Sequence, residues 1–141
     1  MRTSLVGADL HPEGIGLFNW FMRAKGPVSG YTHAMWNGQT TLQFAKVTEK
    51  CMEAELSGLY QPVPAENISK YALLKLFDDV FLDGTKGVYP VDSYRTDKTL
   101  VPTPMPFDCS FPDYRTMLEE MREFVLRNKK WYGHYSMKGI S

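Results

Sequence analysis

The stretch YTHAMWNGQTTLQF, residues 31–44, decides the fold class of this chain. Its Asn37-Gly38 pair stands between alternating residues, which is the pattern typical of a tight β-hairpin. From Phe44 onward, however, apolar residues recur at the spacing of a helix. We therefore predict a short hairpin over residues 31–43, followed by a helix over about 45–57.

Two further stretches predict amphipathic helices downstream of this point. Residues 111–130 place apolar side chains on one stripe and charged ones on the other, and Ser110 with Asp113 forms a capping-box pattern at the start. Residues 65–82 show the same division and are followed by Gly84, a residue suited to end a helix.

The remaining segments are shorter or less regular. Residues 14–24 are apolar nearly all round and predict a fourth helix, which would have to be buried. The short connection before residue 65 predicts that the 65–82 helix turns back on the 45–57 helix as a helical hairpin. VYPVDSYRTDKTLV, residues 88–101, is compatible with a second β-hairpin, and the prolines that follow predict an extended segment over 100–108 that packs against protein.

Together these patterns predict a mainly α fold, with an α+β arrangement as the alternative. We expect a single globular domain over residues 1–128, built from three to four helices and one or two small β-hairpins. Residues 129–141 would form a C-terminal arm rich in aromatic and basic side chains.

Composition limits the classes of function. The chain has 141 residues, 43% of them hydrophobic, and its 16 Lys and Arg balance its 16 Asp and Glu, so no global field favours nucleic acid or an anionic membrane. Its two cysteines, Cys51 and Cys109, are too few for a disulfide framework. The N-terminus shows no secretory signal, and the longest apolar stretch is too short to span a bilayer. These features predict a soluble protein of the cytoplasm or another reducing compartment.

The sequence contains no complete motif for metal, phosphate or nucleophilic chemistry. Asp9 and His11 are close together, but the ligands of a zinc site normally cluster more densely. The glycine-containing stretch 83–87 follows a predicted helix, whereas anions bind at helix N-termini. Cys109 stands near a predicted helix start but has no convincing histidine partner. We therefore predict no metal and no cofactor.

Glu55 is the strongest single candidate for a site. On a helical wheel of residues 45–57 it falls within the apolar arc, where a carboxylate must be paired, protonated or at a cavity. Pairing in a structural role is one interpretation. The other is a ligand pocket in which Glu55 acts as a general base, if the protein is an enzyme, and which His33, Tyr60 and Tyr71 reach.

The C-terminal arm carries four side chains that suit an interface: Trp131, Tyr132, Tyr135 and Met137. Aromatic residues are favoured as interface anchors, so we predict that the arm binds a protein partner or a second copy of the chain. The alternative is that the arm folds back on its own core. Its basic residues also leave open the binding of single-stranded nucleic acid.

These observations favour a non-catalytic interaction or structural subunit of a larger assembly, viral or multi-subunit, over an enzyme. The first alternative is a small-molecule enzyme or binding protein with a pocket around Glu55. The second alternative is a single-stranded nucleic-acid binder that uses the arm.

Overall fold

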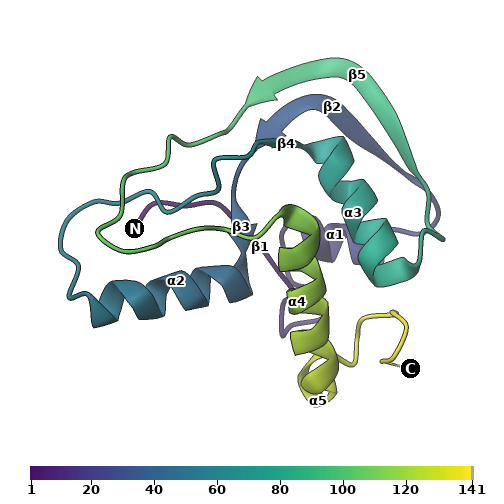
Figure 1. Cartoon of the computed structure of the whole chain (residues 1–141). Helices are drawn as coiled ribbons and strands as arrows, with labels where there is room; N and C mark the ends of the chain where they lie inside the picture. Colours follow the sequence, from purple (N-terminus) through teal and green to yellow (C-terminus); the bar gives the residue numbers. More distant parts are fainter. Residues whose placement is uncertain (141) are drawn as a thin grey trace.

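The structure, a computed structural model, describes residues 1–140 and shows an α+β architecture with 36% helix and 18% strand (Figure 1). The prediction of a mainly α fold is therefore wrong. The elements in chain order are β1 (Leu5–Val6), α1 (Leu17–Arg23), β2 (Val28–Trp36), β3 (Gln39–Thr40), α2 (Thr41–Glu53), β4 (Ile68–Ser69), α3 (Lys70–Leu82), β5 (Val88–Asp97), α4 (Tyr114–Arg127) and α5 (Lys129–Tyr132).

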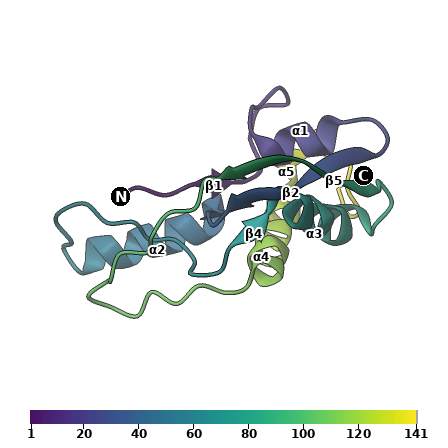
Figure 2. The same cartoon turned by 90° about the horizontal axis from the view of Figure 1, so that it is seen from above.

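Two long strands, β2 and β5, lie side by side in both views and run along one side of the molecule, at the top of Figure 1 (Figures 1 and 2). They pair in parallel, and β4 pairs antiparallel to the other edge of β2, so the sheet order is β4-β2-β5. A parallel pair needs a long crossover, which here contains α2 and α3. Neither predicted hairpin exists, because β3 pairs with β1 in a separate sheet and residues 88–97 form one continuous strand.

The Asn37-Gly38 pair serves close packing instead of a hairpin turn. The buried Asn37 side chain donates to the carbonyls of Pro64 (3.0 Å) and Leu100 (2.8 Å), and its Oδ1 accepts the Leu100 N–H (2.8 Å). At Gly38, any side chain would collide with the Trp36 ring and the Ser4 carbonyl. The pair therefore ties two loops to the end of β2.

The four predicted helices are present, with shifted ends. Thr40, Ser69 and Asp113 cap α2, α3 and α4, each through a side-chain oxygen that accepts a backbone N–H three residues further on. For α4 the cap is Asp113 and not Ser110, so this helix begins at Tyr114. The predicted helical hairpin does not form, since α3 packs against α4 and the sheet while a long connection separates it from α2.

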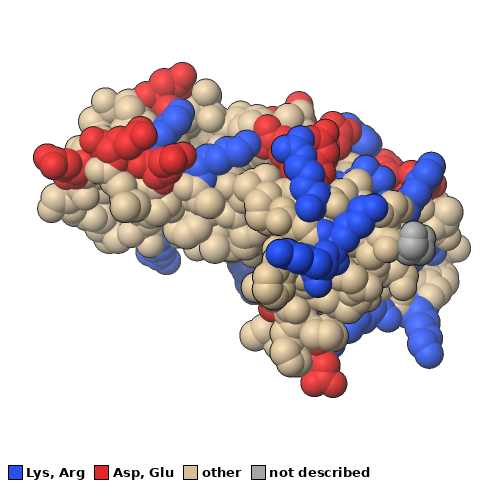
Figure 3. Space-filling view, turned by 90° about the horizontal axis from the view of Figure 1, so that it is seen from below, with Lys and Arg blue, Asp and Glu red and all other residues tan. Residues whose placement is uncertain are grey.

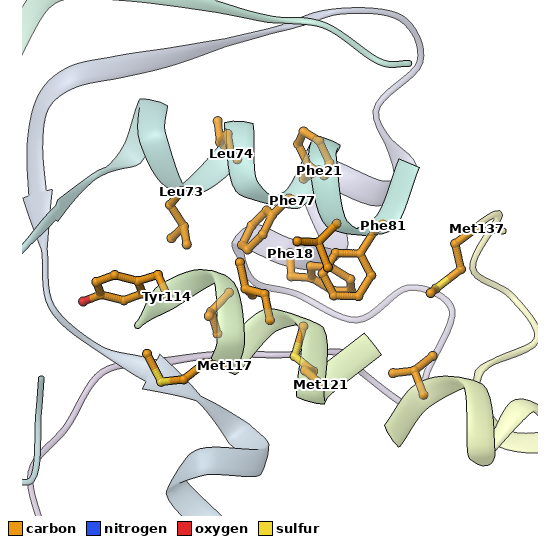
Figure 4. Packing of buried hydrophobic residues seen from close by; sticks show 14 of the residues in the cluster. Phe18, Phe21, Leu73, Leu74, Phe77, Phe81, Tyr114, Met117, Met121 and Met137 are labelled. Atoms are coloured by element: carbon orange, nitrogen blue, oxygen red, sulfur yellow. The ribbon is translucent and has the colours of Figure 1, made fainter. Parts of the chain in front are cut away.

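The hydrophobic core lies between α3 and α4 and is completed by α1 and by the C-terminal arm (Figure 4). The Phe18 ring packs edge-on against Phe77, with ring centroids 5.3 Å apart, and against Phe81 at 4.7 Å. Tyr135 and Met137, 4% and 5% exposed, belong to the same core. The arm thus folds back on the chain that carries it.

The surface carries charges of both signs. Acidic and basic side chains share the face shown in Figure 3, where acidic ones gather at one end, left in the view. Among the helices of residues 1–140, none combines the length and the apolar character needed to cross a membrane.

Candidate functional site

A groove of about 430 Å³ opens beside the β2–β5 pair and brings together five elements. A concave, mostly apolar surface with a few polar groups is the usual form of a small-molecule site. Its lining residues are Leu5 and Val6 of β1, Leu17 of α1, Tyr31, Ala34, Met35 and Trp36 of β2, Lys70 and Leu73 of α3, Tyr94 and Thr96 of β5, and Lys98, which follows β5.

An irregularity in β5 shapes one wall of this groove. Tyr31 pairs with Val91 and His33 pairs with Arg95, so residues 92–94 of β5 stand opposite the single residue Thr32. Such a bulge bends a strand and re-aims its side chains, and bulges are frequent next to active sites. Here the Tyr94 ring lies 4.9 Å from the Tyr31 ring, tilted by 52°. The two tyrosines form an aromatic wall that a regular ladder would not provide.

The charged residues that line the groove are both cationic. They are Lys70, the first residue of α3, and Lys98, which follows β5. The Lys70 Nζ lies 5.6 Å from the centre of the Trp20 ring and 5.7 Å from that of Tyr31. Within residues 1–140, neither lysine forms a salt bridge. The groove therefore carries positive charge without a carboxylate to neutralise it.

Local packing places Lys70 at this position. Ile68 and Ser69 of β4 pair with Trp36 and Met35 of β2, and α3 starts at the very next residue. Behind it, a Cβ added at Gly30 would lie 2.6 Å from the Tyr71 Cα, so glycine allows β2 and the start of α3 to approach closely. The short β4 strand and this glycine together hold Lys70 over the groove.

Trp36, which lines the groove, forms a hydrogen bond to one other segment and a ring contact with a second. Its Nε1 donates to the Ser4 Oγ at 2.8 Å, and its ring lies 6.1 Å from that of Tyr114 on α4. The Tyr114 hydroxyl donates to the Glu66 carbonyl at 3.1 Å, and burial raises the pKa of this phenol, so it stays protonated as a donor. This wall of the groove is therefore rigidly anchored.

The structure does not bear out the predicted pocket around Glu55. The helix α2 ends at Glu53, and Glu55 is exposed beyond it with a φ of 48°. The backbone N–H of Leu56 donates to the Cys51 carbonyl and that of Glu55 to the Met52 carbonyl, which is a Schellman helix end with Glu55 where glycine is usual. The prediction that Glu55 lies within the apolar arc of a helix is wrong, because α2 ends at Glu53, before this residue.

The three residues predicted to reach that pocket do not line the groove either. His33 lies half-exposed on β2 opposite Arg95, and Tyr71 packs against Gly30. Tyr60 lies in the connection between α2 and β4, where its carbonyl accepts the Arg2 N–H at 2.8 Å. His33 and Tyr71 are near neighbours of Tyr31 and Lys70 in the sequence, but Tyr31 and Lys70 themselves carry no local signal, since the groove arises from the parallel pairing of β2 with β5.

The four residues predicted to bind a partner differ in exposure. Tyr135 and Met137 are buried in the core of their own chain, so their side chains offer no surface to a partner. Tyr132 is half-buried, and its ring stacks on that of Tyr135 with the ring centroids 6.4 Å apart, whereas Trp131 is 57% exposed. A binding role for Trp131 and Tyr132 stays a prediction.

The cysteines and possible metal ligands offer no second site. Both cysteines are free, and Cys109 lies outside α4, where burial raises the pKa of its thiol and keeps it protonated. Residues 1–140 contain no group of three or more His, Cys, Asp or Glu side chains that could hold a metal ion.

Comparison with known proteins gives one kind of match. No family model and no curated protein matches the sequence. Among solved structures, the fold is similar to dTDP-4-dehydrorhamnose reductase from Bacillus anthracis in complex with NADP, with a TM-score of 0.68, 14% identity and coverage of 85% of this chain and 46% of that one. The dTDP-4-dehydrorhamnose reductase from Clostridium acetobutylicum is similar with a TM-score of 0.66, 12% identity and coverage of 86% of this chain and 46% of that one. For the enzyme from Yersinia enterocolitica the TM-score is 0.59 and the identity 10%, with coverage of 83% of this chain and 45% of that one.

At these identities the likeness shows the fold alone: an arrangement found in α/β reductases, of whose length this chain spans a little under half. The finding contradicts the prediction of a helical, non-catalytic interaction or structural subunit. That prediction rested on the absence of a complete catalytic motif and on the aromatic C-terminal arm. The fold is nevertheless one found in enzymes, and Tyr135 and Met137 of the arm are buried in the core of their own chain.

Proposed function

We propose that this chain forms the substrate-binding part of a reductase-like enzyme and that its groove takes a nucleotide-linked sugar. The observation that carries the proposal is the groove itself, with its aromatic wall of Tyr31 and Tyr94 and with Lys70 and Lys98, which have no salt-bridge partner in the described part of the chain. An aromatic face suits a planar base or a sugar ring, and lysines suit phosphate. The similar solved structures are named as reductases of a dTDP-linked sugar, which supports this class of ligand.

The proposal assigns substrate binding, and not cofactor binding, to these residues. One of the similar structures holds NADP. A dinucleotide fingerprint requires G-x-G-x-x-G between a strand and the start of a helix. The nearest stretch here has Gly14 and Gly16, but Asn19 stands at the third position and α1 has only 7 residues. The residues present do not fit that cofactor, so we derive no hydride-transfer step through them.

The proposal is tested by filling the groove. Thr96 lines it from β5, so Thr96→Trp should occupy the space next to Tyr94 and abolish binding of dTDP-rhamnose measured by calorimetry. Ser29→Trp is the matched control, since Ser29 is exposed on β2 and does not line the groove. Melting curves of both variants confirm that they fold. Undetectable binding to the wild-type chain, or equal binding to wild type and Thr96→Trp, would overturn the proposal.

A further inference from the structure

We infer that Lys70 selects the phosphates of the ligand, while Tyr31 and Tyr94 hold its base. This inference rests on the proposed function and assigns a role to individual residues of that site. It predicts a graded preference, in which a nucleoside diphosphate binds more tightly than the monophosphate, and the monophosphate more tightly than the uncharged nucleoside.

Two aromatic rings hold the Lys70 side chain in place. Its ammonium lies between two aromatic rings, 5.6 Å from Trp20 and 5.7 Å from Tyr31, and its side chain is only half-exposed. The negative faces of aromatic rings attract a cation and restrict where it moves. A lysine that is already ordered loses less conformational entropy when it binds an anion. Lys70 is therefore preorganised, whereas Lys98 is exposed and has no such contact with an aromatic ring of residues 1–140.

Lys70 lies in a local excess of positive charge. Lys70 is the first residue of α3, a helix of 13 residues, so the positive end of the helix dipole adds to its charge. Carboxylates neutralise other cations in the chain, for example Glu120 at Lys46 and Asp83 at Lys138, but in the described residues no carboxylate lies within salt-bridge distance of Lys70. The net charge of the chain is zero, so this local excess is a property of the groove. It favours a ligand with more than one negative charge.

The tyrosine pair offers aromatic surface to a planar group of the ligand. The two rings are tilted by 52° and do not stack on each other, and both line the groove. Tyr94 is 48% exposed, so a planar base would cover apolar ring surface that now contacts water. An aromatic ring can stack on any nucleobase, because every base has a planar face. The tyrosines would therefore bind the planar group of the ligand, and Lys70 would recognise its charge.

Titrations with dTDP, dTMP and thymidine separate these roles. We expect Lys70→Gln to weaken binding of dTDP by about tenfold or more, as for a lost charge-assisted hydrogen bond, and to leave thymidine unchanged. Lys70→Arg keeps the charge and should restore most of the preference. Lys75→Gln removes one charge from an exposed position of the same helix and is the matched control, with no expected effect. Tyr94→Ala should weaken all three ligands by a similar factor.

The outcomes distinguish the inference from the proposed function. If Lys70→Gln weakens dTDP and thymidine equally, or leaves dTDP unchanged, Lys70 does not select phosphate and the inference fails alone. If the wild-type chain binds none of the three ligands, the proposed function fails and the inference with it. Retention of the preference in Lys75→Gln together with its loss in Lys70→Gln would support both.

Discussion

At the scale of single residues, the polar residues Asn37 and Glu55 both stand out in the sequence but have different physical roles. Asn37 is almost fully buried, and each polar atom of its amide is used to fix a loop. Glu55 is exposed and ends a helix in a conformation that disfavours any residue with a side chain. Burial, rather than polarity, decides which of the two is important for stability.

Asn37→Ala should lower the free energy of unfolding by about 2–4 kcal/mol, because it leaves buried backbone groups of Pro64 and Leu100 without partners. Urea denaturation of the two proteins measures the difference. Asn67→Ala, at an exposed position, is the control and should change stability by less than about 0.5 kcal/mol. Equal midpoints for wild type and Asn37→Ala would show that the amide does not tie the loops.

Glu55→Gly should raise the free energy of unfolding by about 0.5–1 kcal/mol, since glycine adopts the left-handed conformation at a helix end without strain. The same substitution at Glu49, within α2, should lower it by about 1 kcal/mol. Thermal melting of both variants shows whether each substitution raises or lowers the stability. A destabilised Glu55→Gly protein would mean that the carboxylate has a partner in solution.

At the scale of elements, the amphipathic helices were predictable and the strand pairing was not. Helical spacing is a local signal, so α2, α3 and α4 follow from runs such as Leu73, Leu74 and Phe77. The pairing of Tyr31 with Val91 joins strands that a long crossover separates, and no local pattern encodes it. The Asn37-Gly38 pair predicted a hairpin that does not form, because in this fold the two residues make close packing contacts instead of a tight turn.

The C-terminal arm is an element whose anchor can be tested. The buried Tyr135 hydroxyl accepts the Asp9 N–H at 2.7 Å and donates to the Asn19 Oδ1, and burial raises the pKa of this phenol, which keeps the donor protonated. Tyr135→Phe should therefore lower the unfolding free energy by about 1–3 kcal/mol without changing the mass seen by light scattering.

Tyr89→Phe is the matched control for this change, since Tyr89 is 61% exposed, and its stability should equal that of the wild type. A Tyr135→Phe protein that keeps its stability but changes its oligomeric state would contradict the folded-back arm and support an interface role for it.

At the scale of the whole molecule, the candidate site is a product of the fold. Tyr31, Lys70 and Tyr94 come from three elements, and none of them belongs to a sequence motif. A parallel strand pair, a bulge and the start of a helix bring them together. The predicted residues His33 and Tyr71 lie two positions from Tyr31 and one from Lys70, because residue type alone does not show where a side chain lies in the fold.

The most direct test of the groove as a ligand site is amide NMR of the labelled wild-type chain during titration with dTDP. We expect the largest shifts at Tyr31, Lys70 and Tyr94 and in the strands that carry them, with a saturable dependence on ligand concentration. The core residues Tyr135 and Met137 should stay unchanged. Absence of shifts at the groove, or saturable shifts confined to residues 129–140, would contradict the account.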